Sequence, residues 1–175
     1  MPHRKLLVIT AGLVVMLTLA TYAAIAGPRA PASHADVHVI RALGVEDFDA
    51  NALIYSTFRF DPGRSFPHVG ERVRLTDRDR SAAPHTLTVV RPGQVPGSFD
   101  EIFACEPCNA AIEAHLSTDP PTAKVGIEDG LNAPGDSLLI FDGQGIAANV
   151  TAPAGTTLHF VCAFHPWMQG RLVVG

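Results

Sequence analysis

Basic residues are scarce in this sequence, and their scarcity excludes one class of partner. The 175 residues include 13 Lys and Arg against 17 Asp and Glu, a formal net charge of −4. Residues 1–26 hold two of the positive charges and none of the negative ones, so the remaining chain has 11 against 17, a formal charge of −6. Because a nucleic-acid-binding surface needs a basic patch, we expect no nucleic acid partner. The acidic excess is compatible with simple solubility and with a basic protein partner.

Sulfur-containing residues are also few. The chain has three Cys and three Met, and Met168 is the only Met outside residues 1–26. Near the C-terminus Cys162, His165 and Met168 are spaced C-x2-H-x2-M, directly after a predicted apolar strand at 156–161. A lone Cys or Met is usually a core residue, but this joint spacing, followed by a Gly-containing turn and a last apolar strand, predicts that all three side chains share one tight metal-binding loop.

A thiolate, an imidazole and a weak thioether suit copper better than other common metals. A trigonal copper centre needs a second imidazole from a more distant strand, and His85 is the natural source because it opens a predicted alternating strand, 86–90, after a polar turn. We therefore expect His85, Cys162 and His165 to bind copper in one plane and Met168 to form a long axial bond. A structural zinc site would use more Cys or His and no Met.

Other residues near this motif have different expected roles. His68 follows a proline in a predicted turn and should be an exposed loop residue. His159 lies three residues before Cys162, so strand alternation directs it to the opposite face, and neither histidine is expected to bind the metal. Trp167 either covers the site or packs on the surface, and the sequence leaves both open. An apolar patch around His165, formed with Pro166, Trp167 and Pro84, is the expected point of electron exchange, and a charge at Ala163 or Pro84 should disrupt it.

The ligand motif resembles that of the cupredoxins, the small blue copper proteins, and in particular their amicyanin- and plastocyanin-like members. Their ligand loops also read Cys, two residues, His, Pro, an aromatic or small residue, Met and a Gly-containing strand, and the resemblance covers residues 37–90 and 137–175. It implies that His85, Cys162, His165 and Met168 are the ligands of one type 1 copper. One departure is Thr86, which stands where many members have an Asn that ties the two ligand loops together. The other is a long segment with the motif CEPC that interrupts the domain.

The remaining pattern predicts an all-β fold. Short alternating or β-branched segments are separated by Gly, Pro and Asp turns, and Val73 and Leu75 should face one way while Arg72 and Arg74 face the other. We expect strands at 37–43, 52–60, 66–75, 86–90, 137–141, 145–150, 156–162 and 171–174. Seven or eight short strands indicate an antiparallel β-sandwich, and the resemblance implies its Greek-key, cupredoxin-like form.

Residues 1–35 predict export. Arg4 and Lys5 precede an uncharged run at 6–26, and Gly27 and Pro28 end it, as in a secretory signal peptide. The run of 21 residues is also long enough to cross a bilayer as a hydrophobic helix, so a cleaved signal and a membrane anchor both stay open. Residues 27–35 resemble a linker, and 36–175 would form the cupredoxin domain in the periplasm or on the outer face of the cytoplasmic membrane.

Residues 92–136 are too long for a hairpin connection and are expected to be a partly helical insertion. The pattern at 98–116 is helical, with Ser98 and Glu101 spaced as a capping box. Cys108, Ile112 and Leu116 are predicted on one apolar face of the helix. Pro107 is expected to start a new helix.

The insertion also contains the two remaining cysteines, Cys105 and Cys108. In an oxidising compartment a local disulfide is the simplest expectation. A redox-active thiol pair and a second metal site with His115 are the alternatives.

These observations predict an extracytoplasmic blue copper protein that carries single electrons between redox partners and is not an enzyme. A copper oxidase or reductase normally has a second metal centre, for which the chain offers no second His-rich cluster. One alternative is a copper delivery or storage protein, which would bind Cu(I) without a strong blue band. The other is a thiol-redox protein that uses Cys105 and Cys108, although no thioredoxin-like βαβ pattern surrounds the pair.

Overall fold

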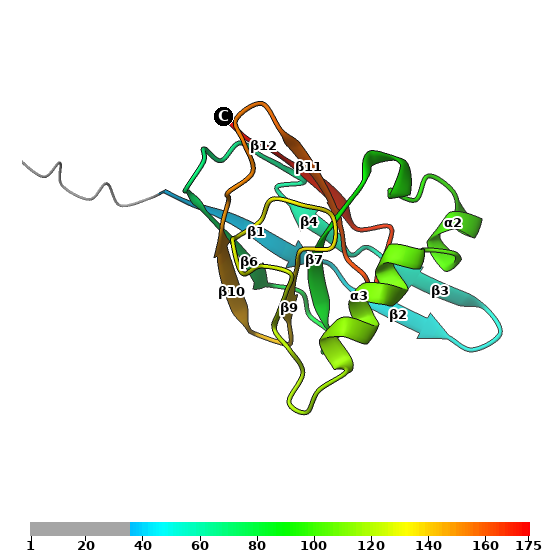
Figure 1. Ribbon diagram of the computed structural model, residues 1–175. Coiled ribbons are helices and arrows are strands. Elements are labelled where there is room, and N and C mark those ends of the chain that lie inside the picture. Colours follow the sequence, from blue (N-terminus) through cyan, green and yellow to red (C-terminus); the bar gives the residue numbers. More distant parts are fainter. Residues whose placement is uncertain (1–35) are drawn as a thin grey trace, which may run out of the picture. The chain divides into compact units, whose positions relative to one another are not determined.

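The computed structural model describes residues 36–175 (Figure 1). The predicted signal or anchor at 1–26 and the linker at 27–35 lie outside the described residues. Within residues 36–175, no helix has both the length and the apolar character needed to cross a membrane.

Two sheets form the body of the fold. One has four strands in the order β10 (Gly145–Asn149), β6 (Arg72–Asp77), β1 (Val37–Leu43) and β4 (Arg59–Asp61). The other has six strands in the order β5 (Arg64–Ser65), β12 (Gln169–Val173), β11 (Thr157–Val161), β7 (His85–Val90), β9 (Ser137–Ile140) and β8 (Lys124–Val125). Most neighbouring strands are antiparallel, but β1 with β6 and β12 with β5 are parallel pairs. The predicted all-β sandwich is therefore confirmed, with two parallel pairs that the sequence did not indicate.

Alternating side chains from both sheets fill the core. In β6, Val73 and Leu75 are fully buried while Arg72 and Arg74 are exposed, as predicted. Phe60 of β4 meets Phe160 of β11 edge to face, with ring centroids 5.0 Å apart. Gly170 of β12 makes room for this pair, since a Cβ there would lie 2.4 Å from the Phe160 ring. The two strands that flank the C-terminal loop are thus fixed by the core.

The predicted strand at 52–60 is wrong as a single element. It divides into β3 (Leu53–Ser56) and β4, and β3 pairs with β2 (Glu46–Asp49) in a separate hairpin. The hairpin side chains Phe48, Leu53, Ile54 and Tyr55 are exposed, so the apolar residues that predicted a core strand lie on a surface hairpin. The strand predicted at 66–75 begins only at Arg72, because Gly70, with φ of 89°, ends a turn there.

The insertion contains a 3-10 turn η1 (Pro92–Gln94) and two helices, α2 (Phe99–Phe103) and α3 (Glu106–Leu116). Ser98 caps α2 by accepting from the Glu101 N–H at 3.3 Å, whereas the Glu101 carboxylate accepts from the Gly97 N–H. The reciprocal half of the predicted capping box is therefore displaced by one residue. Pro107 lies in the first turn of α3, as expected.

The buried face of α3 differs from the predicted apolar face. Cys108, Ala111 and His115 are buried and Ile112 is half-buried, but Leu116 is 47% exposed. This face covers the outer side of β7, and all six residues of β7 are buried. The expected alternation of exposed and buried residues in β7 is absent because the insertion replaces solvent on its outer face.

Candidate metal centre

Two consecutive tight turns produce the ligand loop. The His165 N–H donates to the Cys162 carbonyl at 3.2 Å, and the Met168 N–H donates to the His165 carbonyl at 2.7 Å. Pro166 occupies the second position of the latter turn, where its fixed φ is favourable. The Cys162 N–H then donates to the Met168 carbonyl at 2.9 Å and closes the loop. Each turn joins two residues that are three positions apart, and the two turns share His165. The spacing of Cys162, His165 and Met168 in the sequence is therefore the spacing of two successive turns.

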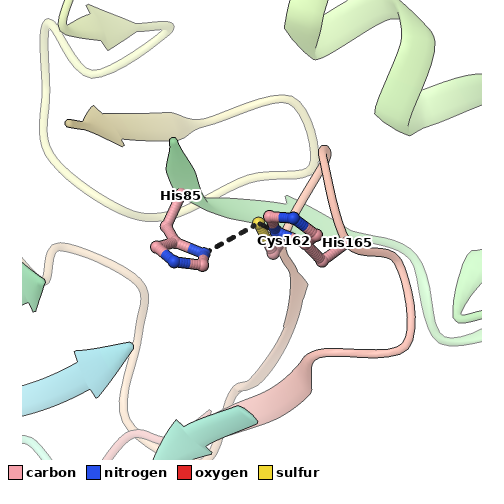
Figure 2. Close-up of side chains that lie close together, drawn as sticks. All are labelled: His85, Cys162 and His165. Carbon is pink, nitrogen blue, oxygen red and sulfur yellow. Dashed lines mark hydrogen bonds between the residues drawn. The ribbon is translucent and has the colours of Figure 1, made fainter. Parts of the chain in front are cut away.

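His85, Cys162 and His165 converge at this end of the sandwich (Figure 2). Their ligand atoms all lie within 4.8 Å of one another. The Cys162 Sγ is 3.8 Å from Nδ1 of His85 and 3.6 Å from Nδ1 of His165. All three side chains are buried, with His165 the least so at 7% exposure. The structure thus brings together the three residues that the sequence predicted for the plane of a metal site.

These distances match a metal-binding geometry. With metal–nitrogen and metal–sulfur bonds of about 2.0 and 2.3 Å, a trigonal or tetrahedral centre holds its nitrogen and sulfur ligands about 3.5–3.7 Å apart. The observed separations are 3.6 and 3.8 Å. One thiolate and two imidazoles, close to a thioether residue, are a donor set that fits one copper ion.

Met168 is buried at 1% exposure and belongs to the same core cluster as Cys162. Its backbone holds the loop, through the bonds to His165 and Cys162. The axial role of its sulfur stays a prediction.

Asp79 fixes the orientation of His85. The Nε2 of His85 is hydrogen-bonded to the Oδ2 of Asp79, and both side chains are completely buried. An imidazole N–H donates to a carboxylate oxygen, so this contact places the ring hydrogen on Nε2 and leaves the Nδ1 lone pair on the side of the Cys162 Sγ, 3.8 Å away. Asp79 is itself held by Ser81, whose N–H and hydroxyl donate to its Oδ1. A carboxylate-to-histidine contact of this kind is a common support for metal-binding imidazoles.

The electrostatics of the metal-free cluster favour neutral ligands. Burial raises the pKa of the Cys162 thiol, partly offset by N–H groups of Thr86, His165 and Phe164. Burial, and then the neighbouring His85, lower the pKa of His165 to about 4, while Asp79 partly raises it. At neutral pH the cluster therefore holds a thiol and a neutral imidazole at His165, and a metal ion would bind Cys162 by displacing its proton.

Thr86 ties the two ligand segments together. Its backbone N–H donates to the Cys162 Sγ at 3.4 Å, and its hydroxyl accepts from the Ala163 N–H at 2.7 Å. Thr86 therefore links the two ligand segments, although it stands where many cupredoxins have an asparagine.

Aromatic rings enclose the cluster. Phe58 packs against both imidazoles, with centroids 5.2 Å from His85 and 4.6 Å from His165. Trp167 meets His165 edge to face at 5.3 Å and is 39% exposed. Trp167 therefore combines the two roles considered for it, because it packs against His165 and is also partly exposed on the surface.

Three other histidines of the described chain, His68, His115 and His159, lie outside the cluster. His68 is exposed, as predicted, and His159 is not among the grouped ligand residues of the described chain. His115 has both ring nitrogens hydrogen-bonded, to the Thr122 carbonyl and to Ser137. Cys105 and Cys108 form the expected disulfide. The alternative of a second metal site with His115 is therefore wrong, because neither cysteine offers a thiolate and His115 offers no free nitrogen.

Sequence reasoning missed Asp79 and Phe58. Asp79 lies in a charged loop where its neighbours Arg78 and Arg80 are exposed, and only its position six residues before His85 hinted at a contact. Phe58 stood inside a segment predicted as one continuous strand.

No protein-family model matches the sequence, and no curated protein matches it. Among solved structures, the chain is similar to a purple cupredoxin from Nitrosopumilus maritimus, with 16% identity and a TM-score of 0.44 over 79% of this chain and 99% of that chain. It is similar to auracyanin A, a "blue" copper protein from Chloroflexus aurantiacus, with 21% identity and a TM-score of 0.44 over 80% and 100%. It is also similar to a mutant plastocyanin of fern, with 18% identity and a TM-score of 0.41 over 78% and 99%.

Proposed function

We propose that this chain is an exported type 1 copper protein that carries single electrons between redox partners. The observation that carries the proposal is the buried group of His85, Cys162 and His165, with sulfur-to-nitrogen separations of 3.6 and 3.8 Å. When bound there, copper would supply a one-electron change between Cu(I) and Cu(II). The residues of the chain supply the geometry, the exclusion of water and the route to the surface.

The ligands are held by contacts that do not depend on the metal. His85 opens β7 and is fixed by Asp79, and the Cys162 loop is closed by its own turns and by Thr86. A site held in this way keeps nearly the same ligand positions in both oxidation states. Small rearrangement favours rapid electron transfer over release of the metal, and this supports a carrier over a copper delivery protein.

His165 is the expected exit for the electron, since it is the least buried ligand and Trp167 extends from it to the surface. Ala163, by contrast, is buried at 4% exposure against the disulfide. The apolar patch therefore centres on Trp167, and Ala163 does not belong to it.

The partner that we propose is a basic protein with an apolar contact face, which would dock on Trp167 and the β2–β3 hairpin. The β2–β3 hairpin leads directly into Phe58, beside the ligands, and exposes Phe48 and Ile54. Residues 44–57 contain Glu46, Asp47 and Asp49 but no Lys or Arg. Acidic groups around apolar side chains complement a partner with the opposite charge, and a small contact suits a short-lived encounter.

Export is proposed from the pattern at 1–26, and the Cys105–Cys108 disulfide is compatible with it because disulfides persist in oxidising compartments. The thiol-redox alternative is less favoured, since Cys105 and Cys108 are only 5% and 1% exposed, which limits the access of a partner thiol.

The experiment is reversible electrochemistry of the copper-loaded protein, combined with transfer of Cu(I) to a competing chelator. A carrier takes up one electron per chain reversibly and keeps its copper in both states. Rapid loss of Cu(I) to the chelator, without a reversible couple, would instead identify a delivery protein.

Docking is tested separately with a basic c-type cytochrome as the probe. Ile54→Lys and Trp167→Lys should slow electron exchange with it while absorption, potential and exchange with a small uncharged mediator stay unchanged. Val69→Lys, at an exposed turn next to the start of β6, is the matched control. If Val69→Lys slows exchange equally, the effect is one of net charge and the proposed docking surface is wrong.

A further inference from the structure

A continuous chain of buried hydrogen bonds runs from the inserted helix α3 to the Cys162 loop. The Nε2 of His115 lies 2.7 Å from the Ser137 hydroxyl, which lies 2.8 Å from the Thr88 hydroxyl. The hydroxyls of Thr88 and Thr86 are hydrogen-bonded at 2.9 Å, and the Thr86 hydroxyl accepts from the Ala163 N–H at 2.7 Å. Ala163 directly follows the cysteine of the metal cluster.

The strands place these groups in line. Thr86 and Thr88 alternate along β7 with Leu87 and Val89, which belong to the sandwich core. The two threonines therefore face the outer side of the sheet, under the insertion. Ser137 is the register partner of Thr88 on β9, so its hydroxyl lies beside that of Thr88.

Every side chain in this chain of bonds is buried. His115, Ser137 and Thr86 are 0% exposed and Thr88 is 1% exposed. Buried hydroxyls and imidazoles are costly unless each finds a partner, so loss of one member leaves its neighbours unsatisfied. His115, at the end of the hydrogen-bond chain that is farthest from Cys162, is also held in place. Its Nδ1 donates to the Thr122 carbonyl at 2.6 Å, and the Thr122 N–H donates to the His115 carbonyl at 2.8 Å.

An apolar contact reinforces the same link. Cys105, Cys108 and Ala111 of the insertion pack in one cluster with Val90, Val161 and Ala163. Val161 and Ala163 are the two residues on either side of Cys162. The backbone of the thiolate ligand is thus bracketed by residues that the insertion covers, and the Ala163 N–H is the point where the polar and apolar contacts meet.

We propose that the inserted segment 92–136 supports the Cys162 loop and that His115 is its positioning residue, acting through Ser137, Thr88 and Thr86 on the hydrogen bonds around the Cys162 sulfur. This rests on the proposed copper-binding function. Hydrogen bonding around the cysteine sulfur tunes the potential of such sites. Thr86 both donates its N–H to that sulfur and holds Ala163, so it transmits a change at His115 to the ligand.

The test uses two variants of the full chain. His115→Phe keeps a ring of similar size but removes both nitrogens, and Thr88→Val keeps the shape of the side chain but removes the hydroxyl in the middle of the chain of bonds. Leu116→Ala, the next residue on α3 and 47% exposed, is the matched control. The two site variants should each lower the potential, since a weaker N–H bond to the sulfur favours Cu(II).

The expected change is about threefold to tenfold in the equilibrium with a redox mediator, the size typical of coupling through packed networks. The double variant should shift it no further than either single variant, because both break the same chain. Leu116→Ala should leave it unchanged. Thr88→Val keeps the test decisive if His115→Phe does not fold.

A second readout needs no copper. Hydrogen exchange of the Ala163 amide in the metal-free protein should be faster in both variants and unchanged in Leu116→Ala. Unchanged potential and unchanged Ala163 exchange, with only a loss of stability, would show that His115 merely packs the insertion and would overturn the proposal. If the protein binds no copper, the proposed function fails, while the Ala163 exchange still decides whether His115 positions the loop.

Discussion

Acid should destabilise the metal-free protein through His165. Burial and the neighbouring His85 lower the pKa of this imidazole to about 4 in the folded state, whereas an unfolded histidine titrates near 6.5. Between these two values the unfolded chain binds a proton that the folded chain does not, so stability is lost as the pH falls from about 6.5 to about 4. The loss approaches a limit set by the difference of about 2.5 pH units, which corresponds to about 3 kcal/mol.

The assay is urea unfolding of the metal-free protein at several pH values between 7 and 4, for the wild type and for His165→Gln. Other groups also titrate in this range, so the relevant quantity is the difference between the two proteins. The wild type should lose about 3 kcal/mol more than the variant between pH 7 and pH 4. Parallel curves for the two proteins would refute the assignment of a buried, neutral imidazole at His165.

Three further predictions concern the ligands and the strands that hold them. Met168→Gln supplies a harder oxygen donor and should lower the reduction potential, and Met168→Leu should raise it; no shift in voltammetry for either variant would mean that Met168 only fills the core. Asp79→Ala removes the acceptor of His85 Nε2 and should weaken copper binding about 10- to 100-fold in chelator competition, whereas Ser117→Ala, at the C-terminal end of α3, should leave it unchanged. Gly170→Ala places a Cβ 2.4 Å from the Phe160 ring and should lower the free energy of unfolding by about 1–3 kcal/mol in urea titration; a stability equal to that of the wild type would show that Phe160 moves freely.

The parts of the site that follow from local sequence were predictable. Cys162, His165 and Met168 are linked by two successive turns, and the spacing of three residues encodes both. The strand at 37–43 has the predicted bounds, because its alternation of apolar and polar residues is a local signal.

The supporting contacts were not predictable, because they depend on how distant segments meet. The contact of Asp79 with His85 requires the folded shape of a loop without any periodic pattern. The burial of Thr86 and Thr88 depends on α3, a helix that begins 18 residues after Thr88 and covers β7. Hydrophobicity alone was misleading at Leu53 and Ile54, which are exposed in the hairpin.

The central claim is that the Cys162 thiolate binds copper together with His85 and His165. Its most direct test is a visible absorption titration of the metal-free protein with Cu(II), in the wild type and in Cys162→Ser. The wild type should develop an intense thiolate-to-copper band that saturates at one copper per chain, and Cys162→Ser should develop none while it stays folded. A band that persists in Cys162→Ser, or a wild type that binds Cu(II) without any such band, would contradict the claim.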